Sequence, residues 1–409
     1  MMAIESDDGV QIDMTAVAES SQSNPANRRY ELMTRIAGCQ EYAEACEHIA
    51  IAVTMTAPSR FHRLRQNGNH WIENKKYDGS SPKQAQEWLC HTWSRFRAFA
   101  DRRGFTYYGM RVVEPHQDGT PHWHAVFFMP LDQVGRFNAG LERYMLGKGR
   151  DLYELYFDDG KPKSKAMRAR FHTQMIDGAA GGAVAYLAKY ISKNVDGHAL
   201  EGVTDSDAHA VKLQEVVKNV TAWSRAFCFR QFQFQRTPSV TVWRELRRIQ
   251  EKQEWCLFEK ARRAADMGFF SAYFDYMGGH RLRQSERPIT TYKREKQNKY
   301  GEFVTVVKGL EGSGLVVFTH ETEWKMVKKD SALAEAEKGS GSDRPWSRGN
   351  NCTVPSKGQR IIDNYYLSLE LDGFDVAHQE WVKSENAGFG VLEVVGKTGS
   401  PFDYARQKG

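Results

Sequence analysis

Two histidines separated by one apolar residue stand at the centre of the run HWHAVFFM, at positions 122 and 124. Successive side chains of a β-strand point to opposite faces, so a strand here places His122 and His124 on one face and Trp123 on the other. The aromatic and β-branched residues of the run favour a buried strand. Two adjacent imidazoles can bind a divalent cation; the alternative is a hydrophobic hairpin whose histidines face solvent.

The preceding run, FTYYGMRVVEP, is the other arm of a predicted hairpin, and its register decides which further side chains join the histidines. A two-residue turn directs Glu114 away from both of them. A three-residue loop, 118–120, with a bulge instead pairs Glu114 with His124 and His116 with His122. We favour this second register, which brings an N/O ligand set around a divalent cation and leaves positions open for substrate.

A second group of reactive side chains lies in GAAGGAVAYLAKYISKNVDG, which predicts a helix that begins after its glycines and ends at Asn194 or Gly197. The apolar stripe of this helix runs from Val184 to Val195 and is complete without its tyrosines. The tyrosines are therefore not needed to form a core.

Tyr186 and Tyr190 are four residues apart and share one helical face, and each is followed three residues later by a lysine, Lys189 or Lys193. One interpretation is two surface tyrosines with solubilising lysines. Beside a divalent metal, however, tyrosine can attack a phosphodiester, because the metal and a lysine offset the charge of the transition state and aid deprotonation of the hydroxyl. The phosphotyrosine product retains the energy of the broken bond, and a second tyrosine can then exchange strands.

The elements that must position these residues follow the order β, α, β, β, α, β. They are a strand over 49–56, a helix over 82–103, the hairpin, a helical stretch over 131–147 and a strand over 171–176. This order predicts an α+β fold with a ferredoxin-like (split βαβ) antiparallel sheet backed by helices. The face that carries the histidines is expected to be the open side of the sheet.

Charge is distributed unevenly along the chain. The formal charge is +6, from 57 Lys and Arg against 51 Asp and Glu, but residues 221–300 hold 17 basic and 8 acidic residues, which gives +9 there and −3 elsewhere. Aromatic residues and arginines alternate in AWSRAFCFRQFQFQRTPSVTVWRELRR, a pattern that suits stacking on bases and binding of phosphates. The predicted DNA contacts are Arg230, Arg244, Arg247 and Arg248. The alternative is a helical domain with a charged exterior.

Three segments resemble the motifs of the HUH rolling-circle replication endonucleases: HWH, VTMTAPSRFH and YLAKYISKN. They are similar to the two-tyrosine branch found in the phage replication gene A protein family. NPANRRYELMTRI and the segment from RQFQ to VTVWRELRR also resemble that family, so the resemblance covers about residues 25–250.

The resemblance implies a DNA replication initiation endonuclease that nicks one strand at an origin, leaves a free 3′ hydroxyl and stays joined to the 5′ phosphate. Its implied cofactor is Mg²⁺ or Mn²⁺, and its implied metal ligands are His122, His124 and either Glu114 or His116. The implied nucleophiles are Tyr186 and Tyr190, with Lys189 and Lys193 as phosphate or proton-handling partners. A transposase or relaxase of the same class, and a non-enzymatic single-stranded nucleic-acid binder, are the alternatives.

On this reading residues 1–24 are a flexible lead, 25–200 the HUH endonuclease domain and 201–290 a mainly helical basic DNA-binding extension. Residues 291–330 are a small β-rich segment, and 331–409 are a linker and carboxyl-terminal region without a recognisable role. The expected partners are single-stranded or supercoiled origin DNA, a host helicase and a polymerase. The six cysteines form no CxxC pair, and the amino terminus is acidic. We therefore expect reduced thiols in the cytoplasm of a bacterial host, with no signal peptide and no membrane span.

Overall fold

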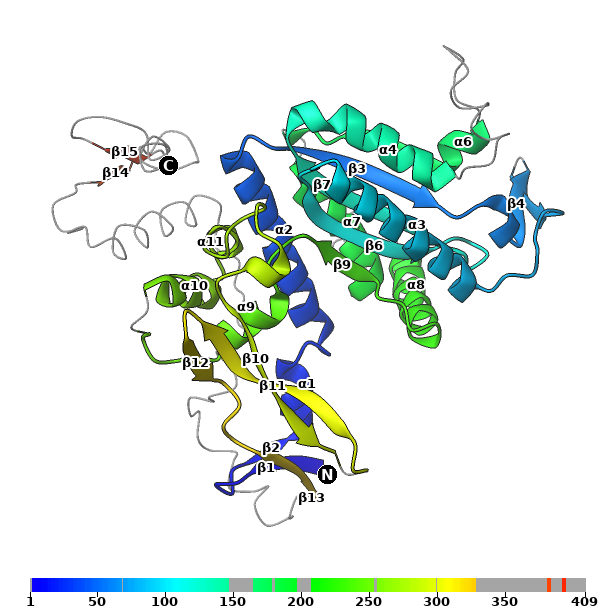
Figure 1. Cartoon of the computed structure of the whole chain (residues 1–409). Coiled ribbons are helices and arrows are strands. Elements are labelled where there is room, and N and C mark those ends of the chain that lie inside the picture. Colours follow the sequence, from blue (N-terminus) through cyan, green and yellow to red (C-terminus); the bar gives the residue numbers. More distant parts are fainter. Residues whose placement is uncertain are drawn as a thin grey trace.

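A computed structural model describes residues 2–67, 69–146, 165–178, 181–196, 207–253, 256–298 and 300–328. Two short paired strands, β14 (Trp381–Lys383) and β15 (Leu392–Val394), are described as well. The remainder of the predicted linker and carboxyl-terminal region, 331–409, lies outside the described residues. The fold is mixed α/β, with antiparallel sheets and several helices (Figure 1).

The central sheet has five strands in the order β8-β3-β7-β6-β9, and every neighbouring pair is antiparallel. Its strands are β3 (Ile49–Thr56), β6 (Tyr108–Pro115), β7 (Pro121–Met129), β8 (Phe171–Met175) and β9 (Phe232–Gln235). The first four were predicted from periodicity and β-branched content. The fifth, β9, comes from the segment expected to form a mainly helical extension, so that segment contributes an edge to this sheet.

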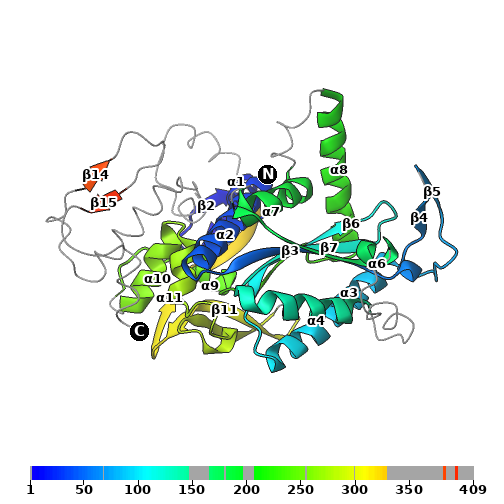
Figure 2. The same ribbon diagram turned by 90° about the horizontal axis from the view of Figure 1, so that it is seen from above.

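Helices α3 (Pro82–Arg102) and α4 (Val134–Leu146) cover one face of the sheet (Figure 2). Helix α3 begins with a capping box, in which the Ser81 hydroxyl accepts a hydrogen bond from the backbone of Gln84 and the Gln84 side chain accepts one from Ser81. Large aromatic side chains fill this layer; the Trp93 and Phe127 rings stack with centroids 5.3 Å apart. A 3-10 turn, η2 (Leu131–Gln133), leads into α4.

The opposite face is also covered, by α2 (Pro25–Ala45) and α7 (Gly182–Val195) (Figure 2). The even-numbered residues of β6 and β7 point into this layer, where Met110, Val112 and Val126 are fully buried. This is the face that carries His122 and His124. The expectation that it is the open side of the sheet was wrong, because the amino-terminal and Tyr-containing helices both pack on it.

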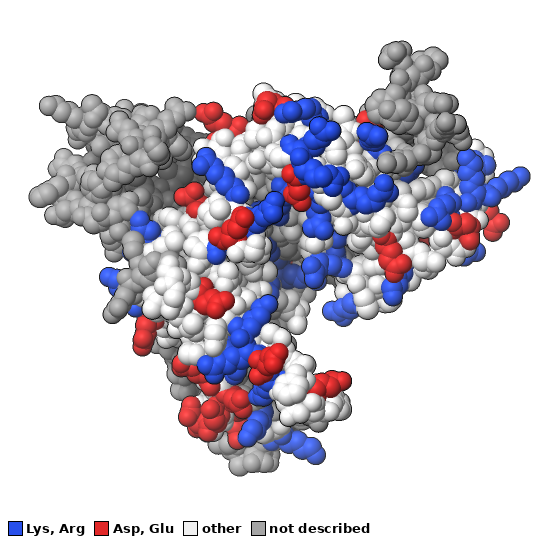
Figure 3. Space-filling model, in the orientation of Figure 1, with Lys and Arg blue, Asp and Glu red and all other residues white. Residues whose placement is uncertain are grey.

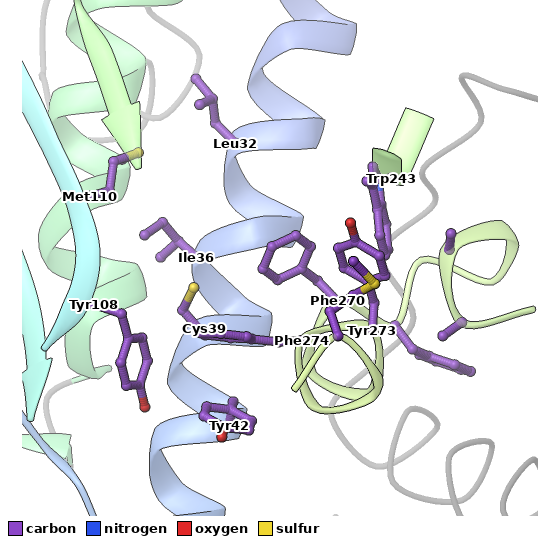
Figure 4. Packing of buried hydrophobic residues seen from close by; sticks show 14 of the residues in the cluster. Leu32, Ile36, Cys39, Tyr42, Tyr108, Met110, Trp243, Phe270, Tyr273 and Phe274 are labelled. Atoms are coloured by element: carbon purple, nitrogen blue, oxygen red, sulfur yellow. The ribbon is translucent and has the colours of Figure 1, made fainter. Parts of the chain in front are cut away.

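Helix α2 lies between the sheet and the helices that follow it in the basic segment (Figure 4). Its Leu32, Ile36 and Cys39 side chains lie toward Met110 and Tyr108 of β6, while Phe270, Tyr273 and Phe274 lie on its other side. These helices are α9 (Val240–Leu246), α10 (Cys256–Asp266) and α11 (Phe270–Tyr276), whereas α8 (Asp207–Ala226) lies beside the sheet, next to α7 and β6 (Figure 1). The buried cluster around α2 therefore joins the basic segment to the sheet.

The amino-terminal segment is structured. Strand β1 (Met2–Ser6) pairs with β2 (Gln11–Asp13) and with β13 (Trp324–Lys328), and α1 (Met14–Ser20) follows. The expected flexible lead was wrong over these residues, because the partner strand of β1 lies more than 300 residues further along the chain. No local pattern in the sequence reveals such a pairing.

The remaining elements include the predicted β-rich segment. It contains β10 (Thr290–Gln297), β11 (Phe303–Gly312) and β12 (Leu315–Phe318), paired in that order. The chain between β3 and α3 forms η1 (Ser59–Phe61) and a hairpin of β4 (Leu64–Asn67) and β5 (His70–Glu73). Helix α6 (Lys165–Arg170) precedes β8, and η5 (Gln284–Glu286) precedes β10.

The central hairpin has a longer connection than either predicted register allows. Strand β6 ends at Pro115 and β7 begins at Pro121, so residues 116–120 form the connection and Glu114 pairs with His122. The favoured register, which paired Glu114 with His124 and His116 with His122, was wrong by two residues. A shift of two preserves the alternation of faces, so Glu114 still lies on the histidine face.

Within the described part of the chain, no helix has the length and the apolar character needed to cross a membrane.

Because β6 and β7 pair closely, we expect a substitution of Gly109 to lower the stability of the fold. The φ of Gly109 is +152°, and a Cβ there would lie 2.0 Å from the carbonyl oxygen of Val126. We expect Gly109→Ala to lower the free energy of unfolding by roughly 2–4 kcal/mol, because backbone and strand must move. Gly135→Ala, where no atom lies within 4 Å of the new Cβ, should change it by less than about 0.5 kcal/mol. Urea unfolding of both variants measures the difference; equal stabilities would contradict the register.

Candidate functional site

Three ligating side chains converge at the β6–β7 hairpin. The Nε2 atoms of His122 and His124 lie 2.8 Å apart. The Oε2 atom of Glu114 is 3.6 Å from Nε2 of His124 and 4.0 Å from Nε2 of His122. All three side chains are partly buried, and their donor atoms could hold one metal ion. Two imidazole nitrogens and a carboxylate oxygen form a donor set that suits Mg²⁺, Mn²⁺ or another divalent ion.

Two neighbouring residues orient these donors. Nδ1 of His124 lies 3.2 Å from the hydroxyl of Thr54 on β3, a contact that leaves Nε2 pointing toward His122 and Glu114. The side-chain amide of Asn194 on α7 donates a hydrogen bond of 2.7 Å to Oε1 of Glu114. The other carboxylate oxygen therefore remains directed at the histidines. Such outer contacts fix the tautomer and direction of metal ligands.

The electrostatic surroundings keep both imidazoles neutral at pH 7. Burial, together with the charges of Lys189, His116 and Lys193, lowers the pKa of His124 to about 4. Burial and the neighbouring histidines hold the pKa of His122 well below its usual range. Neutral imidazoles have a lone pair available for a metal ion. Burial raises the pKa of Glu114, an effect that the hydrogen bond from Asn194 opposes.

His116, the rival third ligand, lies in the connection of the hairpin. Its ring centroid is 4.0 Å from that of His122 and 5.1 Å from that of His62. Nδ1 of His62 lies 3.3 Å from the carboxylate of Asp118. His116 thus packs behind His122, whereas Glu114 is the residue whose donor atom converges with those of the two histidines.

The two tyrosines project from α7 toward the histidines. The Tyr190 ring stacks on the His124 ring, with centroids 4.2 Å apart and planes inclined by 22°. The hydroxyls of Tyr190 and Tyr186 are 3.4 Å apart. Tyr186 is partly buried, but Tyr190 is only 7% exposed and belongs to the core around α2. Although the apolar stripe of the helix is complete without it, Tyr190 joins the core because α7 packs closely against the sheet.

The start of α7 is positioned by two glycines. Gly181 and Gly182 have φ values of +85° and +62°, and a Cβ on Gly182 would lie 2.6 Å from the side chain of Gln40. The Gln40 side chain accepts a hydrogen bond from the backbone of Val184. This contact attaches the first turn of α7 to α2 and sets the direction in which its tyrosines point.

Lys189 lies over both tyrosine rings. Its Nζ atom is 4.6 Å from the centroid of Tyr186 and 4.7 Å from that of Tyr190. Lys189 and Lys193 are exposed, and the charges of both act on Glu114 and His124. The helix therefore brings a positive field to the side of the site where an anionic substrate can approach.

The hydroxyl of Tyr190 is held in its protonated form. Burial raises the pKa of Tyr190 well above its usual range, and the hydrogen bond with Tyr186 and the charge of Glu114 add to the effect. A positive charge placed beside Glu114 would oppose the last of these contributions.

The four arginines predicted to contact DNA have different surroundings. Arg244 makes a two-pronged ion pair with Glu31, with both N–O distances 2.7 Å. Arg247 is 8% exposed, and Nε of Arg248 lies 3.5 Å from a carboxylate oxygen of Glu245. Arg230 is exposed, two residues before β9. In Figure 3, Lys and Arg side chains gather over the part of the molecule that holds α4 and the sheet.

Asn194 and Thr54 are the site residues that sequence reasoning did not assign. Thr54 lies within the predicted strand over 49–56, and its pairing with His124 in the β3–β7 ladder places its hydroxyl beside Nδ1 of that ring. Asn194 follows Tyr190 by four residues, so helical spacing alone puts it on the side of α7 that faces Glu114. That spacing was the available signal.

Comparison with known proteins supports the family resemblance of the HWH, VTMTAPSRFH and YLAKYISKN segments. Residues 1–198 match the family of the bacteriophage replication gene A protein (GPA). This chain belongs to that replication gene A protein family. No solved structure matches the chain.

The curated relatives of this family member are phage and prophage proteins. The replication gene A protein of Escherichia phage 186 is 36% identical over 370 residues, which are 88% of this chain and 52% of that protein. The replication protein of Haemophilus phage HP1 is 34% identical, over 86% of this chain and 45% of that protein. A probable replication endonuclease from a prophage-like region of Salmonella typhimurium is 32% identical, over 85% and 44%. The chain spans about half the length of these relatives.

The contact between Asn194 and Glu114 predicts a specific defect in metal binding. Asn194→Ala frees Glu114 to turn from the histidines, and we expect the Mn²⁺ affinity to fall about 10- to 100-fold. Gln231→Ala is the matched control, because Gln231 contacts Asn194 at 3.4 Å without contacting Glu114. Calorimetric Mn²⁺ titration of both variants measures this; equal affinities would show that the amide does not orient the carboxylate.

The two candidate third ligands are expected to behave differently. Glu114→Ala removes a converging oxygen and should raise the Mn²⁺ dissociation constant by at least about 10-fold, whereas His116→Ala removes a ring that packs behind His122 and should change it by less than about 3-fold. Titration of both variants under the same conditions makes the comparison, and the reverse order would assign the third position to His116.

Proposed function

We propose that this chain is a DNA replication initiation endonuclease that nicks one strand at an origin through a tyrosine nucleophile. The observation that carries this proposal is the stacking of Tyr190 on His124, which brings a tyrosine pair onto an N/N/O metal-ligand set. The family membership and the word endonuclease in the name of a relative support it. The role is rolling-circle initiation, with a 5′-phosphotyrosine link and a free 3′ hydroxyl for the polymerase.

The strand order supports a ferredoxin-like HUH core. The elements β3, α3, β6, β7, α4 and β8 follow one another in the chain as β, α, β, β, α, β. In the sheet these strands lie in the order β8-β3-β7-β6, so the last strand flanks the first and the hairpin lies on the other side. Both connecting helices cover the face opposite the histidines. A split βαβ layout has this arrangement.

His122, His124 and Glu114 would hold Mg²⁺ or Mn²⁺. When bound, the ion supplies a positive charge that offsets the negative charge of the phosphodiester and of its transition state. The protein contributes neutral imidazoles, a carboxylate oriented by Asn194, and a buried setting in which electrostatic attraction is stronger than in water.

The hydroxyl of Tyr186 or Tyr190 attacks the phosphorus. A bond forms between tyrosine oxygen and phosphorus, the bond from phosphorus to the 3′ oxygen breaks, and the proton of the tyrosine passes to solvent or to the departing 3′ oxygen. Lys189, placed over both rings, lowers the cost of the phenolate that develops. Lys193, exposed on the same helix, is suited to hold the phosphate.

The second tyrosine provides strand transfer and termination. With hydroxyls 3.4 Å apart, either tyrosine can approach a phosphate that lies at the site of the other. One tyrosine can therefore hold the 5′ end of the nicked strand while the second attacks a newly made junction.

The proposed partners are single-stranded or supercoiled origin DNA, with a host helicase and polymerase, in the cytoplasm of a bacterial host. The basic side chains over the sheet and α4 and the exposed Arg230 support contact with a phosphate backbone (Figure 3). Arg244 and Arg248 are exposed as well and can reach DNA at the edge of their ion pairs, whereas the burial of Arg247 suits a structural role better.

The enzymatic proposal is tested by the formation of a covalent adduct. The full chain is incubated with supercoiled DNA that carries its source replicon, with Mg²⁺, with Mn²⁺ or with chelator. We expect a relaxed circle with protein attached in the two metal reactions and none in the chelated one. A protein that binds the DNA without an adduct in any metal is a nucleic-acid binder, and the proposal fails.

The tyrosine pair predicts a graded result in the same assay. Tyr186→Phe and Tyr190→Phe should each abolish strand exchange, with at least one of them still nicking, and the double variant should lose nicking by at least about 1,000-fold because no nucleophile remains. Tyr144→Phe, on α4 at the opposite face of the sheet, is the control and should act as the parent does. A double variant that still nicks would overturn the assignment.

A further inference from the structure

A second group of potential ligating side chains lies at the junction between α2 and the sheet. Cys46 ends α2, His48 precedes β3 by one residue, and His280 follows α11. One donor atom from each, the thiol sulfur and an imidazole nitrogen of each histidine, lies within 4.8 Å of the other two. The ring centroids of His48 and His280 are 4.8 Å apart. All three residues are partly buried.

Each imidazole of this group is held by a tyrosine hydroxyl. Nδ1 of His48 lies 3.1 Å from the hydroxyl of Tyr108, and Nδ1 of His280 lies 3.0 Å from that of Tyr42. Figure 4 shows these two tyrosines facing each other from β6 and α2. These contacts leave Nε2 of each ring available, and the Tyr42 hydroxyl also hydrogen-bonds to the Cys46 thiol. Metal-binding histidines commonly have their second nitrogen held in this way.

The loop that carries His280 docks closely on α2. Gly279 has a φ of +60°, and a Cβ there would lie 2.1 Å from the hydroxyl of Tyr42. The backbone N–H of His280 donates to the same hydroxyl at 3.3 Å. Glycine is therefore required beside His280 for the loop to approach, and the position of the histidine next to Cys46 and His48 is fixed by these contacts.

This group is separate from the site at the hairpin. Tyr108, which holds His48, pairs with Phe128 at one end of the β6–β7 ladder, while Glu114 pairs with His122 at the other. The two positions lie six residues apart along β6, which corresponds to about 20 Å along a strand. Met110, Val112 and Val126 fill the same face between them. One ion cannot serve both groups.

We propose that Cys46, His48 and His280 form a binding site for a thiophilic divalent metal ion of the Zn²⁺ type. Sulfur and imidazole nitrogen are the donors that Zn²⁺ prefers, whereas a thiolate does not suit Mg²⁺. On binding, the Cys46 thiol loses its proton to solvent and its sulfur forms a bond to the metal, so one proton is released for each ion bound. The charge of Asp275 beside Cys46 favours the ion, and that of Arg281 opposes it.

The ion would link two segments that are distant in the sequence. Cys46 and His48 belong to the junction of α2 with the first strand of the sheet, while His280 belongs to the segment that follows the helices of the basic extension. Only the folded protein brings these residues together, so the ion should stabilise the folded state. The site then links the sheet to the part of the chain that carries α9, α10 and α11 and stabilises the contact between them.

A titration with Co²⁺ distinguishes this group from the hairpin site. The full chain is stripped of metal and titrated with Co²⁺, followed by absorption. We expect a thiolate-to-cobalt charge-transfer band that rises to a maximum during the titration and is lost on addition of Zn²⁺. The ligand set of Glu114, His122 and His124 contains no sulfur and cannot give this band. Absence of the band would overturn the proposal, as would its persistence in Cys46→Ser.

Zinc content tests the histidines. In the background of His122→Ala with His124→Ala, the chain should retain about one Zn²⁺ after desalting, and addition of His280→Ala or Cys46→Ser should remove it. Cys228→Ser and His70→Ala, which alter an exposed thiol and an exposed imidazole, are the controls and should retain it. Retention of zinc in His280→Ala would contradict the site.

A labelling measurement on the unaltered chain covers the case in which a variant fails to fold. Zn²⁺ should slow alkylation of Cys46, read by mass spectrometry of its peptide, by at least about 10-fold without slowing that of Cys228, and Mg²⁺ should slow neither. Equal rates of alkylation of Cys46 with and without Zn²⁺ would overturn the proposal.

Discussion

The two halves of the candidate site meet where the side-chain amide of Asn194 hydrogen-bonds to the carboxylate of Glu114. A hydrogen bond between an amide and a buried carboxylate contributes about 1.5–3 kcal/mol, and here it also sets a direction. It leaves one carboxylate oxygen facing His122 and His124. Because Asn194 lies one turn after Tyr190, the same contact fixes the register of α7 against the hairpin and so the stacking of Tyr190 on His124.

One face of one sheet carries both proposed metal sites, with buried apolar side chains between them. Glu114, His122 and His124 lie at the hairpin end, and the tyrosines that hold His48 and His280 belong to the other end and to α2. Helix α2 packs against this face along its length and connects the sheet with α11. The amino-terminal helix, the sheet and the basic segment therefore form one continuous core, and the site depends on all three.

Local patterns predicted the strands and helices of the sheet, and the alternation of a strand predicted that His122, His124 and Glu114 share a face. The register was wrong because the hairpin connection has five residues, closed by a backbone hydrogen bond from His116 to Thr120 that no turn motif indicated. The burial of Tyr190, the pairing of β1 with β13 and the approach of His280 to Cys46 depend on contacts between distant segments. The periodicity of the sequence does not reveal such contacts. The role of Asn194, in contrast, could have been inferred from its spacing to Tyr190.

The metal ligands proposed on the hairpin and the tyrosines on α7 would form one reacting site. The most direct test of this proposal is the identity of the residue that becomes joined to DNA. The covalent adduct is digested with protease and nuclease, and the nucleotide-bearing peptide is sequenced by mass spectrometry. We expect a nucleotide on Tyr186 or Tyr190 and on no other residue. A nucleotide on a serine, or on a tyrosine outside α7, would contradict it.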